Sequence, residues 1–154
     1  MDNKLKLRNK ALKLISYKEY SVNNLSEKLY SYAKNLTDDI NKDDVNELLE
    51  EFKEKRWVSD ARAVESLVNQ KSSRYGLSRM KVELKKLKVC ENIVQSTLSE
   101  LASTEFKRAE LVLKKKYFSP PVDYNESCKQ KNYLFRRGFV LDVCNSVVNK
   151  RVSN

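Results

Sequence analysis

Residues 57–89 read WVSDARAVESLVNQKSSRYGLSRMKVELKKLKV. In the first half of this stretch, Ser59 is placed to cap a helix, and apolar residues then recur at helical spacing. Gly76 is expected to end that helix, because glycine tolerates the left-handed backbone common at helix ends. Ser78 is placed to cap a second helix, which also carries an apolar stripe. The stretch therefore predicts two amphipathic helices joined by a short turn.

The same pattern recurs earlier and later in the chain. Leu29, Leu84 and Leu134 hold equivalent places in it and are separated by 55 and 50 residues. A unit of this size buries its own apolar face poorly, so tandem copies stack against one another. The sequence predicts an all-α protein of three tandem three-helix repeats in an elongated, curved arrangement. The expected repeats are residues 1–57, 58–103 and 104–154.

Two predicted turns lie after the central stretch. Asn92 is placed to cap a helix that runs to Leu101, and Phe106 opens a separate helix. Later, Gly138 is suited to a left-handed helix end, with Phe139 making the apolar contact that follows such an end.

The composition favours an anionic partner and a helical chain. Lys and Arg number 31 against 21 Asp and Glu, which gives a net charge of +10. Such a charge attracts nucleic acid or an acidic protein surface. Two Gly and two Pro in the whole chain leave little material for hairpins or phosphate-binding loops. No apolar stretch is long enough to span a bilayer, and the first ten residues lack a signal-peptide core. We expect a cytoplasmic monomer.

No catalytic or metal-binding pattern is present in the sequence. The chain has no histidine, no glycine-rich phosphate loop and no G-x-S-x-G motif. Asp38 and Asp39 are indistinguishable from ordinary surface acids. The three cysteines, Cys90, Cys128 and Cys144, are widely spaced and are expected to be reduced packing residues. We therefore expect neither enzymatic activity, nor a cofactor, nor a metal site.

Each expected repeat carries a set of residues in a recognisable order and spacing. In the first repeat these are Ala11, Leu12, Leu14, Glu19, Ser21, Leu25, Lys28 and Leu29. In the second repeat they form two groups: Trp57, Val58, Asp60 and Arg62, then Gly76, Arg79, Met80, Glu83 and Leu84. In the third repeat they are Ala109, Lys115, Lys116, Leu134, Arg137, Gly138 and Phe139. On these residues the chain resembles the RecX family of regulators of the RecA recombinase over nearly its whole length.

The sequence departs from the family pattern at Ala63 and Val64, where an aromatic residue and alanine are usual, and at Lys88, which replaces glycine. A left-handed helix end at Lys88 would cost about 1 kcal/mol relative to glycine, so the turn there is expected to be built differently from that of the family.

The resemblance implies a negative regulator that binds the RecA–DNA filament and inhibits its ATPase, strand exchange and growth. Such a protein acts in homologous recombination, DNA repair and the SOS response, and it contacts single- and double-stranded DNA weakly or through the filament. The expected contact residues are Arg62, Arg74, Arg79, Lys115, Lys116, Arg136 and Arg137. Each could equally be a solvated cation at a helix end. Trp57, Leu84, Leu134 and Phe139 are expected in the core.

A direct duplex-DNA-binding protein of helix-turn-helix type is the alternative. Its recognition helix would span residues 78–88 and lie in the major groove. This helix offers arginine and lysine but neither asparagine nor glutamine to read adenine. Its residues therefore suit phosphates better than base edges.

Overall fold

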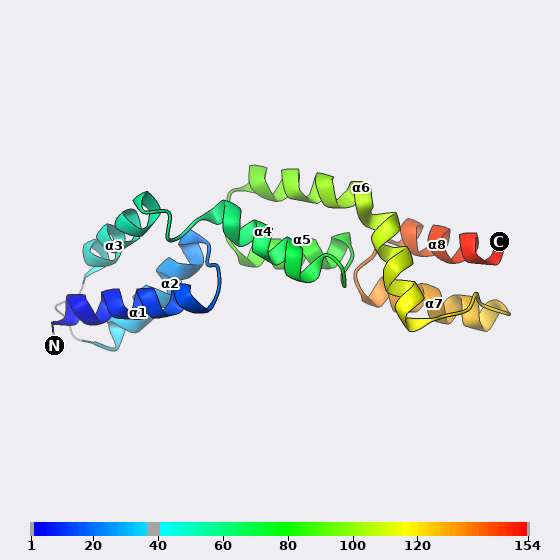
Figure 1. Cartoon of the computed structure of the whole chain (residues 1–154), viewed down its shortest axis with the longest axis horizontal. Helices are drawn as coiled ribbons and strands as arrows, with labels where there is room; N and C mark the ends of the chain where they lie inside the picture. Colours follow the sequence, from blue (N-terminus) through cyan, green and yellow to red (C-terminus); the bar gives the residue numbers. More distant parts are fainter. Residues whose placement is uncertain (1, 37–40, 154) are drawn as a thin grey trace. The chain divides into compact units, whose positions relative to one another are not determined.

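A computed structural model of the whole chain describes residues 2–36 and 41–153 (Figure 1). Within these ranges the chain forms eight α-helices and no strand, which confirms the all-α prediction. The helices are α1 (Asn3–Tyr17), α2 (Val22–Lys34), α3 (Lys42–Glu54), α4 (Asp60–Lys71), α5 (Leu77–Lys86), α6 (Glu91–Lys116), α7 (Tyr124–Arg136) and α8 (Leu141–Ser153). Asp38 and Asp39 lie outside the described residues.

The chain divides into two compact units. The first comprises residues 1–66 and 87–89, and the second comprises residues 67–86 and 90–154. The boundary falls within α4, so the three-repeat division at residues 57 and 103 stays a prediction.

In the first unit, α1, α2 and α3 pack against one another around one apolar core. Leu25, Leu29, Val45 and Phe52 are fully buried there. Trp57 was expected in this core but is 39% exposed. Its ring packs edge-on against Phe52 at 5.2 Å, and Lys55 covers it at 4.6 Å. The aromatic contact is kept while the ring remains at the surface.

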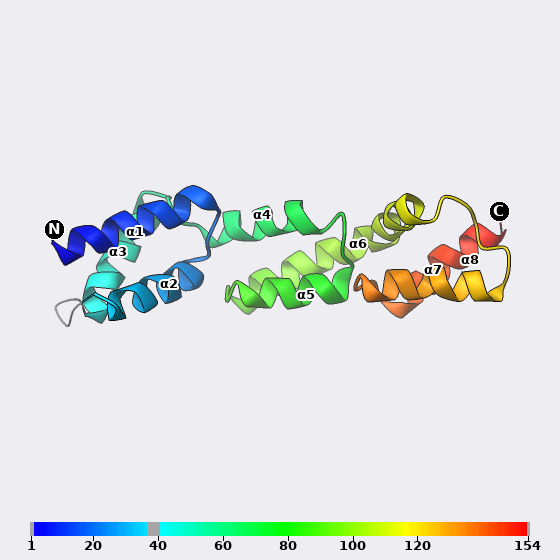
Figure 2. The same cartoon turned by 90° about the horizontal axis from the view of Figure 1, so that it is seen from below.

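In the second unit, α6 packs against α5, α7 and α8 (Figures 1 and 2). The predicted core residues Leu84, Leu134 and Phe139 are all buried. The separation expected between Leu101 and Phe106 is wrong, because α6 is one helix of 26 residues. Its buried stripe continues through Leu98, Leu101, Glu105, Ala109 and Val112, and no Gly or Pro interrupts it.

The helix ends show where sequence-based capping succeeds. Gly138 has φ 88°, and the amides of Gly138 and Phe139 donate to the carbonyls of Phe135 and Leu134. This is the Schellman arrangement predicted for the end of α7. Lys88 also adopts a left-handed backbone, with φ 56°. The turn after α5 therefore keeps the glycine-type conformation without glycine, and the expectation that it is built differently is wrong.

Two cap predictions near α5 and α6 are wrong. Helix α5 begins at Leu77, so Ser78 already lies inside its first turn. Helix α6 begins at Glu91 after Cys90, so Asn92 lies inside it as well. At α4 the prediction is confirmed, since the Arg62 amide donates to the Ser59 hydroxyl at 3.3 Å.

Candidate partner-binding surface

A tyrosine ring gathers three guanidinium groups in the second unit. The Cζ atoms of Arg79, Arg74 and Arg137 lie 4.9, 5.5 and 5.8 Å from the centroid of the Tyr75 ring. Cations within about 6 Å of an aromatic centroid are attracted by the ring quadrupole. We call these four residues the Tyr75 cluster. One aromatic side chain thus holds three like charges close together.

Backbone hydrogen bonds bring the two parts of this cluster together. The Gly76 amide donates to the Arg137 carbonyl at 2.9 Å, and the Ser78 amide donates to the Gly138 carbonyl at 2.9 Å. The start of α5 is therefore tied directly to the chain segment that follows α7. These two hydrogen bonds place the Arg137 side chain beside the Tyr75 ring.

The close approach explains both glycines. A Cβ atom on Gly76 would lie 2.3 Å from the Cα and N atoms of Phe139. A Cβ atom on Gly138 would lie 2.4 Å from the Arg79 Cβ. Gly76 does not have a left-handed backbone, so its expected role as a helix stop is wrong. Its function is to let two backbone segments touch.

A buried carboxylate supports this contact from beneath. Glu105 of α6 is 3% exposed, and its Oε1 accepts from the Leu77 amide at 3.2 Å and from the Val140 amide at 3.0 Å. These amides stand at the starts of α5 and α8, where backbone donors lack partners within their own helix. A negative charge is favourable there because of the helix dipoles. Glu105 thus fixes two helix ends with one side chain.

Arg108 holds the turn that carries Arg74 and Tyr75. Its guanidinium donates to the carbonyls of Ser72 at 2.9 Å, Tyr75 at 2.7 Å and Leu101 at 2.8 Å. Burial lowers the pKa of Arg108, and the nearby Glu105 carboxylate opposes that effect. No sequence pattern indicated this role, because acids and bases on α6 look like ordinary surface charges.

Positive charge is in excess around the cluster. The buried Glu83 carboxylate accepts from Lys71 Nζ at 3.0 Å, Arg79 Nε at 3.1 Å and Lys86 Nζ at 3.4 Å. The hydrogen bond from Lys71 is the main cause that lowers the pKa of Glu83, and burial acts against it. One carboxylate therefore balances three cations.

Two guanidinium groups of the Tyr75 cluster have no carboxylate partner among the described residues. Arg74 only approaches the Gln70 carbonyl, at 3.5 Å, besides the Tyr75 ring. Arg137 lies over a second ring, that of Tyr133, at 5.2 Å. Their planar donors are thus oriented by aromatic contacts and remain available for an anion.

The other predicted contact residues lie outside the Tyr75 cluster. Arg62 belongs to the first unit, where its Nε pairs with Glu19 at 3.3 Å and its Nη1 donates to the Arg56 carbonyl at 2.6 Å. Lys115 and Lys116 are exposed at the end of α6, and Arg136 is exposed at the end of α7. The structure brings together Arg74, Arg79 and Arg137, and sequence reasoning missed Tyr75 between them.

Other kinds of site find little support. No group of three or more His, Cys, Asp or Glu side chains that could hold a metal ion occurs in the part of the chain that the structure describes. No helix across residues 2–36 and 41–153 has the length and apolar character needed to cross a membrane.

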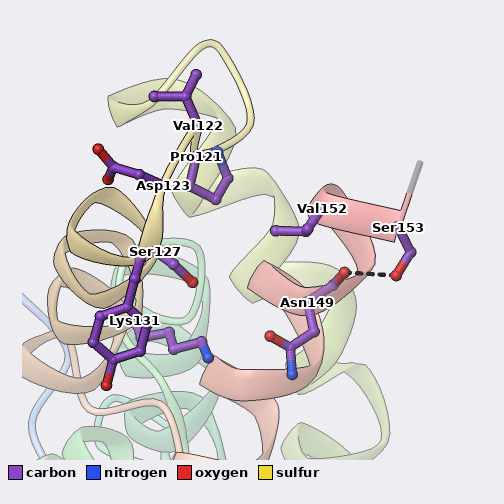
Figure 3. Close-up of a pocket in the computed structure, with 9 residues that line it drawn as sticks. Pro121, Val122, Asp123, Ser127, Lys131, Asn149, Val152 and Ser153 are labelled. Atoms are coloured by element: carbon purple, nitrogen blue, oxygen red, sulfur yellow. Dashed lines mark hydrogen bonds between the residues drawn. The ribbon is translucent and has the colours of Figure 1, made fainter.

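A groove of about 450 Å³ lies between the start of α7 and the end of α8 (Figure 3).

Comparisons with known proteins give a consistent result. No protein-family model matches the chain. Regulatory protein RecX of Ralstonia pickettii (strain 12J) is 32% identical over 144 residues, covering 94% of this chain and 87% of that protein. Regulatory protein RecX of Herbaspirillum seropedicae is 34% identical over 135 residues, covering 88% and 84%. The crystal structure of RecX from Lactobacillus salivarius has the same fold, with a TM-score of 0.75, 22% identity and coverage of 98% and 97%.

Proposed function

Since this chain belongs to the RecX family, we propose that it is a negative regulator of the RecA recombinase. It binds the RecA–DNA filament and inhibits ATP hydrolysis, strand exchange and filament growth. It acts as a cytoplasmic monomer in recombination and repair, and it contacts DNA weakly or through the filament.

The Tyr75 cluster is the observation that best supports this proposal. Its three guanidinium groups lie within 5.8 Å of one ring centroid, and two of them lack a carboxylate partner among the described residues. Holding like charges together is unfavourable unless an anion approaches, and arginine binds both carboxylate and phosphate through paired donors. A filament of protein and DNA offers both groups. The net charge of +10 adds long-range attraction to such a partner.

We assign contact roles first to Arg74 and Arg137, which have no carboxylate partner among the described residues, and next to Arg79, whose Nε pairs with Glu83. Lys115, Lys116 and Arg136 extend the basic surface of the second unit, and Arg62 is a further candidate in the first unit.

The direct duplex-DNA-binding protein remains the second candidate, with α5 as its recognition helix. Within the expected recognition helix, residues 78–88, three basic side chains are already in ion pairs. Arg79 and Lys86 pair with Glu83, and Lys88 pairs with Glu27. These pairs leave fewer free donors for base edges, so we favour the filament regulator.

The deciding experiment measures DNA-dependent ATP hydrolysis by the cognate RecA filament as substoichiometric amounts of the protein are added. Slower hydrolysis supports the proposal. Unchanged hydrolysis combined with tight binding to bare duplex DNA supports the second candidate instead.

A matched pair of variants tests the cluster. Arg74→Ala should weaken filament binding and flatten its salt dependence, because one anion contact is lost. Lys13→Ala removes the same charge from an exposed position on α1 and should leave binding nearly unchanged. Equal effects of the two substitutions would mean that net charge acts rather than the Tyr75 cluster.

A further inference from the structure

Large apolar side chains are unusually exposed in and next to the loop between α6 and α7, residues 117–123. Phe118 is 91% exposed and Val122 is 83% exposed, and Tyr124, which begins α7, is 79% exposed. These are the three most exposed large apolar side chains among the described residues. Such surface is costly in water and often marks an interaction site.

The backbone on both sides of Phe118 is held in place. Arg151 of α8 donates from Nη2 to the Tyr117 carbonyl at 2.6 Å, and Gln130 of α7 donates to the Ser119 carbonyl at 3.2 Å. Arg151 also donates from Nη1 to the Gln130 side-chain oxygen at 2.7 Å. This clamp fixes both neighbours of Phe118 while its ring points away from the protein core.

The remainder of the loop is fixed as well. Pro120 and Pro121 each restrict their own φ angle. The Val122 amide donates to the Glu126 carboxylate at 2.9 Å, and the Glu126 amide donates to Asp123 at 2.8 Å. A side chain that is presented on a fixed backbone loses little conformational freedom when a partner binds it.

Beside the loop runs a groove whose lining mixes apolar side chains with polar ones, among them Asp123 and Asn149. Figure 3 shows Pro121 and Val122 of the loop on one side and Val152 of α8 on the other. Lys131 contributes an ammonium group to the same lining. The surface therefore combines a protruding aromatic ring with an adjacent groove that has aliphatic side chains and one charged group of each sign, Asp123 and Lys131.

The chain next to Phe118 carries a run of positive charge. Lys114, Lys115 and Lys116 are all exposed, and only Tyr117 separates them from Phe118. Protein interfaces are often anchored by an aromatic residue that enters an apolar pocket of the partner. Charged side chains around such an anchor pair with opposite charges at the edge of that pocket. Val122 in the same loop exposes an aliphatic side chain, and aliphatic surface fits a shaped protein pocket better than the flat face of a nucleobase.

We propose that Phe118 is a protein-docking anchor that enters an apolar pocket edged by carboxylates on the recombinase subunit. This inference rests on the proposed function, which supplies the identity of the partner. Lys114–Lys116 pair with the carboxylates at the edge, while Val122 and the groove cover the side of the contact. The Tyr75 cluster, which lies in the same unit, is a separate contact surface for anionic groups of the partner.

The test compares binding of wild type, Phe118→Ala, Phe118→Leu and Phe135→Ala to a RecA filament formed on single-stranded DNA with a slowly hydrolysed ATP analogue. Phe118→Ala should weaken binding by about tenfold or more, which corresponds to ~1.4 kcal/mol. Phe118→Leu should fall between Phe118→Ala and wild type, because it keeps part of the apolar contact. Phe135, which is 57% exposed on α7, provides the matched control and should be near wild type.

Salt dependence and thermal unfolding separate this effect from others. Phe118→Ala removes no charge, so the slope of affinity against salt should stay that of wild type. The thermal transition should also be unchanged, since the ring is exposed.

Several results would overturn the docking role. Wild-type affinity in Phe118→Ala excludes it while leaving the proposed function intact, whereas failure of wild type to bind the filament removes both. An equal loss of affinity for bare single-stranded DNA would identify Phe118 as a base-stacking residue instead. Self-association of wild type that Phe118→Ala abolishes in sedimentation would identify the occupant as a second copy of the chain.

Discussion

Two junctions in the molecule have the same plan: the start of one helix is hydrogen-bonded to the segment that follows a later helix. They use equivalent positions of the chain but different kinds of hydrogen-bond donor. In the first junction, within the first unit, the Ser21 hydroxyl donates to the Leu87 carbonyl. The Asn23 side-chain amide donates to the Lys88 carbonyl at 2.6 Å. The first junction is therefore bridged by side chains.

The second junction, within the second unit, uses the backbone for the same two bonds. The amides of Gly76 and Ser78 donate to the carbonyls of Arg137 and Gly138. Ser21 and Gly76 are related by the same spacing as Leu29 and Leu84, and Asn23 and Ser78 by that spacing again. Carbonyls at equivalent positions thus accept from side chains in the first junction and from backbone amides in the second.

This difference explains why one junction requires glycine and the other accepts lysine. Backbone-to-backbone bonds bring the chains so close that a Cβ on Gly76 or Gly138 would collide. Side-chain bridges leave room, so Lys88 faces only the cost of its left-handed backbone, about 1 kcal/mol. The first junction therefore tolerates a change that the second could not.

The largest expected effect is at Gly76. Gly76→Ala places a methyl group 2.3 Å from the Phe139 backbone, so the second junction must open. We expect a loss of about 3 kcal/mol or more in the free energy of unfolding, measured by urea denaturation.

Ser21→Ala is the counterpart in the first junction. It removes a helix cap and a bridge without adding volume and should cost about 1 kcal/mol. If the two substitutions cost the same, backbone contact is not what distinguishes the junctions.

The next effect concerns the carboxylate beneath each junction. Glu105 accepts two amides at helix starts, whereas Asp60 accepts one, the Val22 amide at 2.8 Å. Glu105→Ala leaves two part-buried backbone donors unpaired and should cost about 2–3 kcal/mol, against about 1 kcal/mol for Asp60→Ala. Urea denaturation of both variants measures the difference, and the reverse ranking would contradict the structure.

A smaller effect of opposite sign is expected at Lys88. Lys88→Gly relieves the left-handed backbone but gives the unfolded chain more freedom, so we expect a net gain of about 0.5 kcal/mol. Lys88→Ala is the matched control, because it removes the ion pair with Glu27 and keeps the Cβ atom. A gain in both variants would show that the ion pair, and not the backbone, is unfavourable.

A dependence on alkaline pH is expected from Cys144 of α8, whose thiol donates to the Phe139 carbonyl at 3.5 Å, beside the second junction. Burial, with a further contribution from Glu105, raises the pKa of the Cys144 thiol from its ordinary 9.0 to about 11. The unfolded chain therefore releases this proton at lower pH than the folded chain, and stability present below pH 9.0 falls as pH rises towards about 11. Unfolding measured across this range should show a shallower decline in Cys144→Ala; equal declines would remove Cys144 as the cause.

Particular residues show how far sequence reasoning reached. The end of α7 at Gly138 was predictable because glycine, arginine and phenylalanine there follow a local rule of backbone geometry. Trp57 was misplaced, because its apolar surface could be covered by Phe52 and Lys55 without full burial. The continuity of α6 was missed because an apolar stripe does not show whether a polar interval such as residues 103–105 bends the chain.

The candidate site was only half visible in the sequence. Arg74 and Arg79 stood out through their nearness to Gly76, and Arg137 through its place before Gly138. Nothing local indicated that all three meet at Tyr75. The same holds for Glu105 and Arg108, whose partners lie about thirty residues away in the chain.

The sequence by itself determined the helical class, the recurring unit and the resemblance to RecX proteins, because periodicity, caps and charge are properties of neighbouring residues. Only the tertiary structure decided why Gly76 and Gly138 cannot carry a side chain, why Lys88 can, and which arginines share one ring. Those features depend on distances between segments far apart in the chain, and such distances are fixed by packing rather than by local preference.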